Sequence, residues 1–167
     1  MKLNVRKIVM ASLLAALVCV ATMILKIPSP LKGYLNLGDG IVLLAGWALS
    51  PLYGFLAAGL GSALADLFSG YLVYAPATFL IKGGMALLAT VIFRFCRNRL
   101  GDFWGRLLGG ISAELFMIGG YYVFEGILYG FAPALVNIPA NAVQAVAGLI
   151  LGMILIKTFE KNKISLS

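Results

Sequence analysis

The chain has 167 residues, of which 62% are hydrophobic and only 11% are charged. A soluble domain of this length is not so apolar, so the composition excludes one and predicts a single integral membrane domain over residues 1–167. A net charge of +7 can indicate a nucleic-acid partner, but here the basic residues stand at the ends of apolar segments, where membrane topology explains them, and no nucleic acid is expected.

The sequence offers little for catalysis or metal binding. Histidine is absent, and the two cysteines, Cys19 and Cys96, form no C-x-x-C pair. The commonest general base and the commonest metal ligand are therefore missing. There is also no G-x-x-x-x-G-K-[ST] nucleotide loop, no H-E-x-x-H helix and no G-x-S-x-G elbow. We expect no catalytic residues, no metal and no cofactor, and the protein is not expected to be an enzyme.

Six apolar segments follow one another along the chain. The first, with about 20 residues, is long enough to cross roughly 30 Å of hydrocarbon, and it lacks the A-x-A-like exit of a cleaved signal peptide. The second is short for a span, is ended by Pro51, and could be tilted or partly re-entrant. The predicted helices are Ile8–Ile27, Leu37–Leu49, Leu52–Phe68, Thr78–Phe93, Leu107–Phe124 and Ala134–Ile156.

The basic residues predict the topology of these helices. The two termini and a basic loop at Arg94–Arg106 hold ten of the thirteen lysines and arginines, and the opposite side holds only Lys26 and Lys32. Cytoplasmic loops carry such an excess of positive charge. The sequence therefore predicts an all-α integral membrane protein with six transmembrane helices and both termini in the cytoplasm.

Three ionisable residues, Asp39, Asp66 and Lys82, lie inside apolar sequence. A charge within a span costs about 2.5–3.5 kcal/mol and usually faces a cavity or a partner. Asp66 precedes Gly70 by four residues and Lys82 follows Pro76 by six, which at 1.5 Å rise per residue places both charges roughly 6–9 Å below the same membrane face. They could form a structural ion pair that fixes helix register, or they could bind a polar solute.

Further polar residues fall on single helix faces in the second half of the chain. Glu114 and Glu125 are eleven residues apart, close to three helical turns, and Asn137, Asn141 and Gln144 follow the i, i+4, i+7 pattern of one stripe. Single amides in membrane helices often only join helices, for about 0.6 kcal/mol each. Three amides on one stripe, together with carboxylates and a lysine, favour a polar pocket.

Four tyrosines stand in the predicted outward loops, where they could form an interfacial belt or stack on a planar ligand: Tyr34, Tyr71, Tyr74 and Tyr129. We take Tyr74 as the stacking candidate. The predicted substrate-binding residues are Asp66, Tyr74, Lys82, Glu114, Glu125, Asn137, Asn141 and Gln144. Asn36 and Asp39 are expected in an outer lid, although Asp39 could instead cap its helix.

Several stretches resemble a known family. ASLLAAL near the N terminus, NLGDG, GSALADLFSGY leading to APATFLIKG, and FEGILYG followed by NIPANAVQ are similar to the substrate-binding S component of energy-coupling factor (ECF) vitamin transporters. The resemblance covers essentially the whole chain. It is closest to the branch associated with hydroxymethylpyrimidine and pyridoxine-type substrates.

The resemblance implies a multi-pass protein of a prokaryotic cell membrane that captures a vitamin or precursor from outside. It also implies delivery through a membrane coupling subunit and two ATPase subunits. In the family a small-x-x-x-small motif on the first helix docks the coupling subunit, and the match here is Ala11 and Ala15. Ser12 and Ala16 make an equally good register, and ordinary packing within the chain would look the same.

The sequence therefore predicts a non-enzymatic capture subunit for a small aromatic heterocycle with hydroxymethyl or amine substituents, without identifying the vitamin. A second class is a self-sufficient transporter or channel in which Asp66 and Glu114 relay protons. A third class, an intramembrane enzyme, is disfavoured by the missing motifs.

Overall fold

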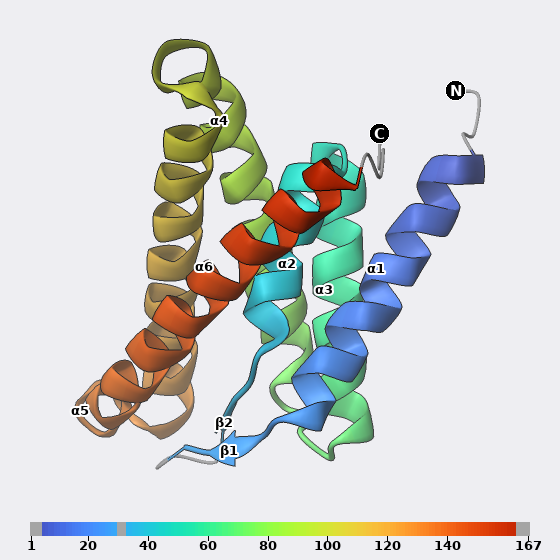
Figure 1. Cartoon of the computed structure of the whole chain (residues 1–167). Helices are drawn as coiled ribbons and strands as arrows, with labels where there is room; N and C mark the ends of the chain where they lie inside the picture. The colour runs from blue at the N-terminus through green and yellow to red at the C-terminus, as the bar shows by residue number, and fades with distance from the viewer. Residues whose placement is uncertain (1–4, 30–32, 163–167) are drawn as a thin grey trace.

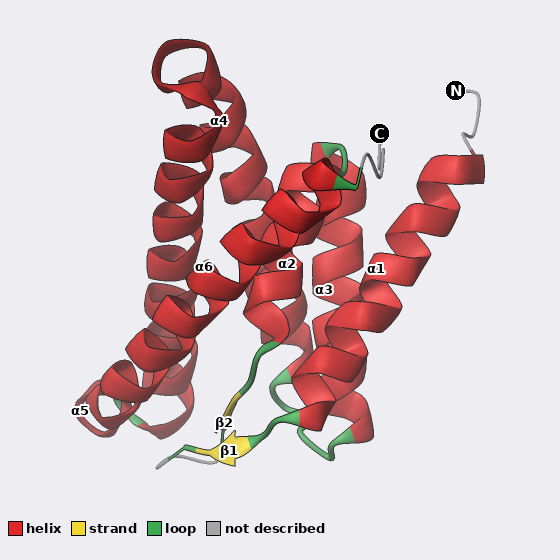
Figure 2. Cartoon of the chain, in the orientation of Figure 1, coloured by secondary structure: helices red, strands yellow, loops and turns green. Residues whose placement is uncertain are grey.

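The computed structural model describes residues 5–29 and 33–162, and this part of the chain is almost entirely helical (Figures 1 and 2). A two-stranded antiparallel ribbon pairs Ile27 with Leu35 and Pro28 with Tyr34. The elements, in chain order, are α1 (Val5–Ile24), β1 (Ile27–Pro28), β2 (Tyr34–Leu35), α2 (Gly38–Ala48), α3 (Pro51–Phe68), α4 (Ala75–Tyr129), α5 (Phe131–Ala134), the 3-10 turn η1 (Leu135–Asn137) and α6 (Ile138–Lys161).

Helix α4 is a hairpin of two arms that turns at Gly101 (Figure 1). Gly101 has φ 82° and ψ 171°, a backbone conformation that glycine adopts at no steric cost. The arms touch closely, since a Cβ on Gly109 would lie 2.8 Å from the carbonyl oxygen of Ala89. The predicted helices at residues 78–93 and 107–124 lie within the two arms. The predicted loop between them was wrong, because one glycine makes the turn and the basic segment on either side is helical.

Helix α2 is the central, buried helix of the bundle. Ten of its eleven residues are buried, and α1, α3, α4 and α6 all pack against it. The contact with α4 is at backbone distance, because a Cβ on Gly46 would come within 2.6 Å of the Ala86 carbonyl oxygen. The Thr90 hydroxyl donates to the carbonyl oxygens of both Gly46 and Ala86. Because α2 is short and enclosed by the other helices, its first turn, which contains Asp39, lies inside the bundle.

Length and composition make four helical segments of the described residues candidates for crossing a membrane, namely Val5–Ile24, Pro51–Phe68, Ala75–Tyr129 and Phe131–Lys161. Large apolar side chains cover their outer faces, for example Ile24 and Phe95, which are 76% and 74% exposed. Such surfaces fit a lipid environment. The prediction of a helical membrane protein is confirmed in this coarser form, while six crossings and the cytoplasmic side stay predictions.

The two ends of the bundle differ in charge. The start of α1, the end of α6 and the turn of α4 lie together at the top of Figure 1, whereas β1, β2 and α5 lie at the bottom. The top end carries most of the described basic side chains, among them Arg6, Lys7, Arg97, Arg99, Lys157 and Lys161. Among the described lysines and arginines, Lys26 lies at the surface of the other end and Lys82 is buried inside the bundle. The basic end is therefore the one predicted to face the cytoplasm.

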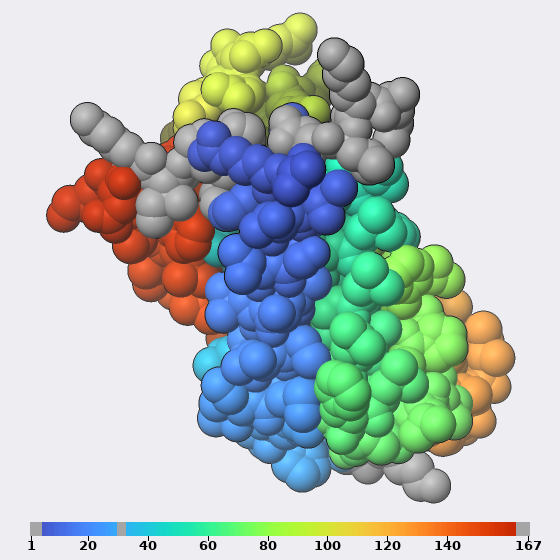
Figure 3. Space-filling model, turned by 90° about the vertical axis from the view of Figure 1, so that its right-hand side faces the viewer, coloured from blue at the N-terminus to red at the C-terminus, as the bar shows by residue number. Residues whose placement is uncertain are grey.

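Helices α1 and α3 lie side by side along one face of the molecule (Figure 3). They meet at backbone distance, because a Cβ on Gly61 would lie 2.4 Å from the Ala15 carbonyl oxygen. Ala11 is 8% exposed and faces this contact, whereas Ser12 and Ala16 are exposed. The predicted docking pair, Ala11 and Ala15, is thus turned largely toward α3, and the second register is the one that faces outward.

Candidate functional site

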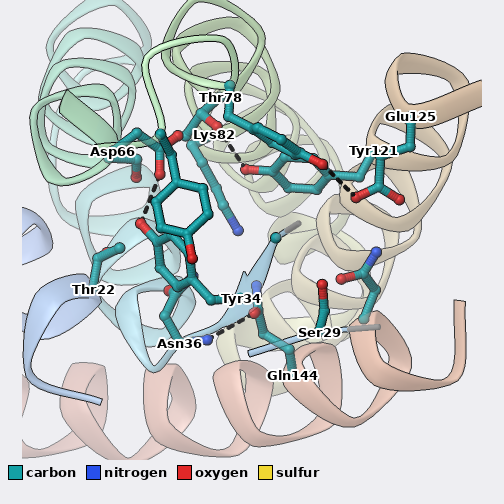
Figure 4. Close-up of a pocket in the computed structure, with 15 residues that line it drawn as sticks. Thr22, Ser29, Tyr34, Asn36, Asp66, Thr78, Lys82, Tyr121, Glu125 and Gln144 are labelled. Atoms are coloured by element: carbon teal, nitrogen blue, oxygen red, sulfur yellow. Dashed lines mark hydrogen bonds between the residues drawn. The ribbon is translucent and has the colours of Figure 1, made fainter. Parts of the chain in front are cut away.

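A polar pocket lies at the end of the bundle opposite the basic turn (Figure 4). It is formed by α1, the β ribbon, α3, the α3–α4 turn, both arms of α4, and α6. The pocket contains about 470 Å³ of space, including its open mouth. Its lining is Thr22, Ser29, Gly33, Tyr34, Asn36, Ser62, Asp66, Tyr71, Tyr74, Thr78, Lys82, Tyr121, Glu125, Asn141 and Gln144.

The lysine at the base of the pocket is paired with Asp39. Lys82 Nζ bonds Asp39 Oδ1, and the two side chains are 2% and 0% exposed. Gln144 Nε2 donates to the other Asp39 oxygen at 2.7 Å, and Gln144 Oε1 accepts from the Asn36 backbone N–H at 2.9 Å. An ion pair so enclosed needs these additional hydrogen bonds to offset its desolvation. The network ties α2, α4 and α6 together beneath the pocket.

This pairing corrects two predictions. Asp66 and Lys82 lie on neighbouring elements of one pocket, but Lys82 bonds Asp39 and not Asp66. Asp39 was expected in an outer lid or as a helix cap, and it is instead fully buried in the ion pair. Asn36 does line the pocket, and its Oδ1 accepts from the Gly38 backbone N–H at 2.9 Å, which caps the start of α2.

The Asp66 carboxylate is held at one oxygen only. Its Oδ1 accepts from the Tyr34 hydroxyl at 2.6 Å. Its buried Oδ2 has no hydrogen-bond partner among the described residues. Burial, and after it the charge of Asp66, raise the pKa of Tyr34, so the tyrosine keeps its proton and remains the donor. Asp66 therefore offers one anchored and one open oxygen.

Glu125, on the second arm of α4, repeats this arrangement. Its Oε1 accepts from Asn137 Nδ2 at 2.8 Å and from the Tyr74 hydroxyl at 3.4 Å. Its Oε2 is buried and unpartnered within the described residues. Burial is the main cause that raises the pKa of Tyr74, followed by its hydrogen bond with Tyr129. Tyr74 is therefore also a protonated donor to its carboxylate.

Aromatic rings cover part of the pocket wall. The ring centroids of Tyr34 and Tyr71 are 4.9 Å apart, and those of Tyr71 and Tyr74 are 6.2 Å apart with nearly perpendicular planes. The Tyr121 hydroxyl and Thr78 Oγ1 are hydrogen-bonded at 3.1 Å. The Lys82 ammonium stands 5.4 Å from the Tyr121 ring centroid. Such rings can stack on a planar ligand or receive a cation.

The structure brings together most of the residues selected from the sequence. Six of the eight predicted substrate-binding residues line the pocket: Asp66, Tyr74, Lys82, Glu125, Asn141 and Gln144. Asn137 stands behind Glu125 as its donor. Glu114 is buried but does not line the pocket. It lies close to Asp39, because a Cβ built on Gly148 would come within 2.6 Å of Asp39 Cβ and 2.8 Å of Glu114 Oε1.

Sequence reasoning missed six lining residues: Ser29 and Gly33 beside the β ribbon, three hydroxyl residues within helices (Thr22, Ser62 and Thr78), and Tyr121. The three hydroxyl residues occur singly within apolar or small-residue sequence, where they give no signal. Tyr121 stands between Glu114 and Glu125, on the stretch already predicted to carry a polar face, and that position was the available signal.

An apolar helical bundle that holds a polar, tyrosine-lined pocket at one end defines a membrane protein that binds a small molecule. Residues 2–161 match the family model of the ECF-type riboflavin transporter, S component. The chain belongs to this family of ECF transporter S components. It is therefore a substrate-binding membrane component of a transporter and not an enzyme. The family implies a small-molecule substrate and a coupling module with ATPases.

Two curated relatives and one solved structure resemble the chain. An uncharacterised protein of Pyrococcus woesei is 38% identical over 137 residues, which cover 81% of this chain and 88% of that protein. The thiamine precursor transporter HmpT of Lactococcus lactis subsp. cremoris is 25% identical over 163 residues, which cover 96% and 92%. The solved S component of a bacterial ECF transporter superposes with a TM-score of 0.77 at 24% identity, covering 95% and 98% of the chains. This last likeness supports the fold alone.

Proposed function

We propose that the chain captures a small aromatic heterocycle of the hydroxymethylpyrimidine or pyridoxine type and delivers it through a coupling subunit and two ATPases. The observation that carries the proposal is the pocket itself, in which open carboxylate oxygens of Asp66 and Glu125 stand among tyrosine rings. Carboxylates accept hydrogen bonds from ring substituents such as hydroxymethyl and amino groups. The similarity to a thiamine precursor transporter supports the same class of ligand.

Riboflavin is the second candidate, because the matching family model carries its name. The pocket holds about 470 Å³ of space including its open mouth, toward the lower end of the roughly 300–1,000 Å³ range of small-molecule sites. A single six-membered ring needs far less of this volume than a three-ring flavin. The present shape therefore favours the smaller ligand.

Ligand binding without an energy source is the direct test of the capture role. The purified chain is expected to bind an amino-hydroxymethylpyrimidine or a pyridoxine vitamer in detergent, without nucleotide and without ATPase activity. Calorimetric titration measures the binding, and mass spectrometry of the small molecule that copurifies identifies the ligand. Cells that contain this chain without coupling partners should accumulate little substrate. Concentrative uptake by the lone chain, abolished by an uncoupler, would instead support proton-coupled transport.

The proposed orientation places the pocket outside the cell and the basic end in the cytoplasm, with six crossings. A reporter fused after Ser167 and a reporter inserted at residues 97–101 are both expected to be cytoplasmic. A reporter inserted at residues 29–32 is expected outside. Protease protection or cysteine labelling in intact cells distinguishes the sides. A C terminus found outside the cell would contradict both the helix count and the direction in which the pocket faces.

The coupling subunit is proposed to dock on α1. Exposed small residues at Ser12 and Ala16 leave a shallow strip to which another helix can come close. Beside this strip, a groove between α1 and α3 is lined by Ile8, Ala11, Ser12, Ala15, Tyr53, Leu56, Ala57 and Leu60. The strip lies toward the basic end of α1, away from the pocket, so docking leaves the mouth of the pocket open.

A further inference from the structure

The two pocket carboxylates share an unusual geometry. In each, a tyrosine hydroxyl donates to one oxygen, Tyr34 to Asp66 and Tyr74 to Glu125. In each, the second oxygen is buried and has no hydrogen-bond partner within residues 5–29 and 33–162. A buried acceptor left without a donor costs about 1–3 kcal/mol. Within the described residues, two such oxygens in one pocket leave acceptor sites that the donor groups of a ligand can fill.

The carboxylates stand on different walls. Asp66 comes from the end of α3 and Glu125 from the far end of the second arm of α4. Figure 4 shows them on opposite sides of the pocket, with the Lys82 side chain running between them. A ligand that meets both open oxygens must therefore carry hydrogen-bond donors on two opposite edges.

The lysines around the pocket do not supply the donors that the open oxygens of Asp66 and Glu125 lack. Lys82 is neutralised by Asp39, whose second oxygen is bonded to Gln144. Lys26 lies at the rim, where its Nζ donates to Ser69 Oγ at 2.5 Å and stands 5.7 Å from the Tyr34 ring centroid. Glu114, buried next to Asp39, adds a further carboxyl group on the α4 side. In the described part of the chain, four carboxyl groups thus stand near two lysines.

We propose that Asp66 and Glu125 are specificity-determining residues that select a heterocycle with donor groups on two opposite edges and reject phosphorylated or carboxylated forms. This inference rests on the proposed function and narrows its substrate class to an amino-substituted, unphosphorylated ring. Carboxylate oxygens accept hydrogen bonds, and each of these two groups already accepts one from a tyrosine hydroxyl. A phosphate placed against either open oxygen would bring mainly further acceptor oxygens to a group that lacks a donor.

Matched ligand pairs test the proposal by calorimetric titration of the full chain in detergent. The probes are an amino-hydroxymethylpyrimidine, its analogue without the amino group, its phosphate ester, pyridoxamine, pyridoxine and riboflavin. The amino compound of each pair is expected to bind about 10- to 100-fold more tightly than its partner, and the phosphate ester at least as much more weakly. Asp66→Asn and Glu125→Gln should each remove most of this selectivity while keeping the shape of the side chain.

Asp102→Asn is the matched control, since Asp102 is a 51% exposed carboxylate beside the α4 turn, far from the pocket. It should change none of the affinities. If either substitution in the pocket prevents folding, the ligand pairs on the unaltered chain still decide the matter. Equal or tighter binding of the analogue without the amino group, or of the phosphate ester, would overturn the inference and leave the proposed function standing. Binding of riboflavin alone would overturn both.

Discussion

Replacing Lys82 with methionine is expected to lower the free energy of unfolding by about 3–5 kcal/mol, because it leaves the Asp39 carboxylate buried without its counter-charge. Asp39 is fully enclosed, and the remaining donor to its carboxylate is the Gln144 amide at 2.7 Å. Asp39→Asn alone should be similarly costly, since it leaves the ammonium of Lys82 unpaired. Chemical unfolding in detergent, followed by tryptophan fluorescence, measures the change.

The double variant Asp39→Asn, Lys82→Met should recover most of the lost stability. It removes both charges together, and replacement of a whole buried pair by neutral groups is often nearly neutral. Asp66→Asn combined with Lys82→Met serves as the matched control. It should show no such recovery, because Asp66 bonds Tyr34 and not the lysine. Recovery in the Asp66 combination, and its absence in the Asp39 combination, would show that the ion pair is assigned to the wrong aspartate.

The Lys82–Asp39 ion pair is the part of the site that the sequence did not predict. Spacing from the nearest turn correctly places Asp66 and Lys82 in one pocket, because rise per residue is fixed within a helix. It does not predict which acid reaches Lys82. That depends on α2, whose eleven residues cover only part of a bilayer as a helix, while the chain from β2 to α2 covers the rest of that crossing. Since α2 begins within the bundle, its first-turn aspartate is enclosed, a position that residue counting from the membrane face does not indicate.

The helices themselves were largely predictable from apolar segments bounded by proline, glycine and charge. The exception is the basic segment between the two arms of α4, which was predicted as a loop. Arginines suit an exposed helix as well as a loop, and Arg97 and Asp102 lie within 3.5 Å of each other across the turn. Gly101, with its positive φ, is sufficient to reverse the chain. Composition could indicate the turn region but not its length.

The outward stripe of α1 depends on helical phase, which small-residue spacing alone does not reveal. Both Ala11/Ala15 and Ser12/Ala16 satisfy the four-residue spacing. They differ by one residue, which rotates the face by about 100° on an α-helix with 3.6 residues per turn. Only the packing of α3, brought to backbone distance by Gly61, shows that the first pair is turned inward and the second outward.

Transport should therefore respond to substitution of Ser12 in a way that ligand binding does not. Ser12→Leu or Ala16→Leu is expected to lower uptake by about 10- to 100-fold in cells that contain the coupling subunit and ATPases, since a bulky side chain at a close helix contact costs about 1–3 kcal/mol. Ligand affinity of the purified variant should stay unchanged, because neither residue lines the pocket. Radiolabelled uptake and calorimetric titration measure the two effects separately.

Two further substitutions make this result specific to the exposed stripe of α1. Gly119→Leu places the same bulk on the outer face of α4, where a Cβ meets nothing within 4 Å, and should leave both uptake and binding intact. Ala11→Leu should instead destabilise the isolated chain, because its side chain is 8% exposed against α3. If Ala11→Leu abolishes uptake with unchanged stability while Ser12→Leu has no effect, the coupling subunit must dock on the inward face. Docking there would use the groove between α1 and α3, which Ala11 and Ala15 line.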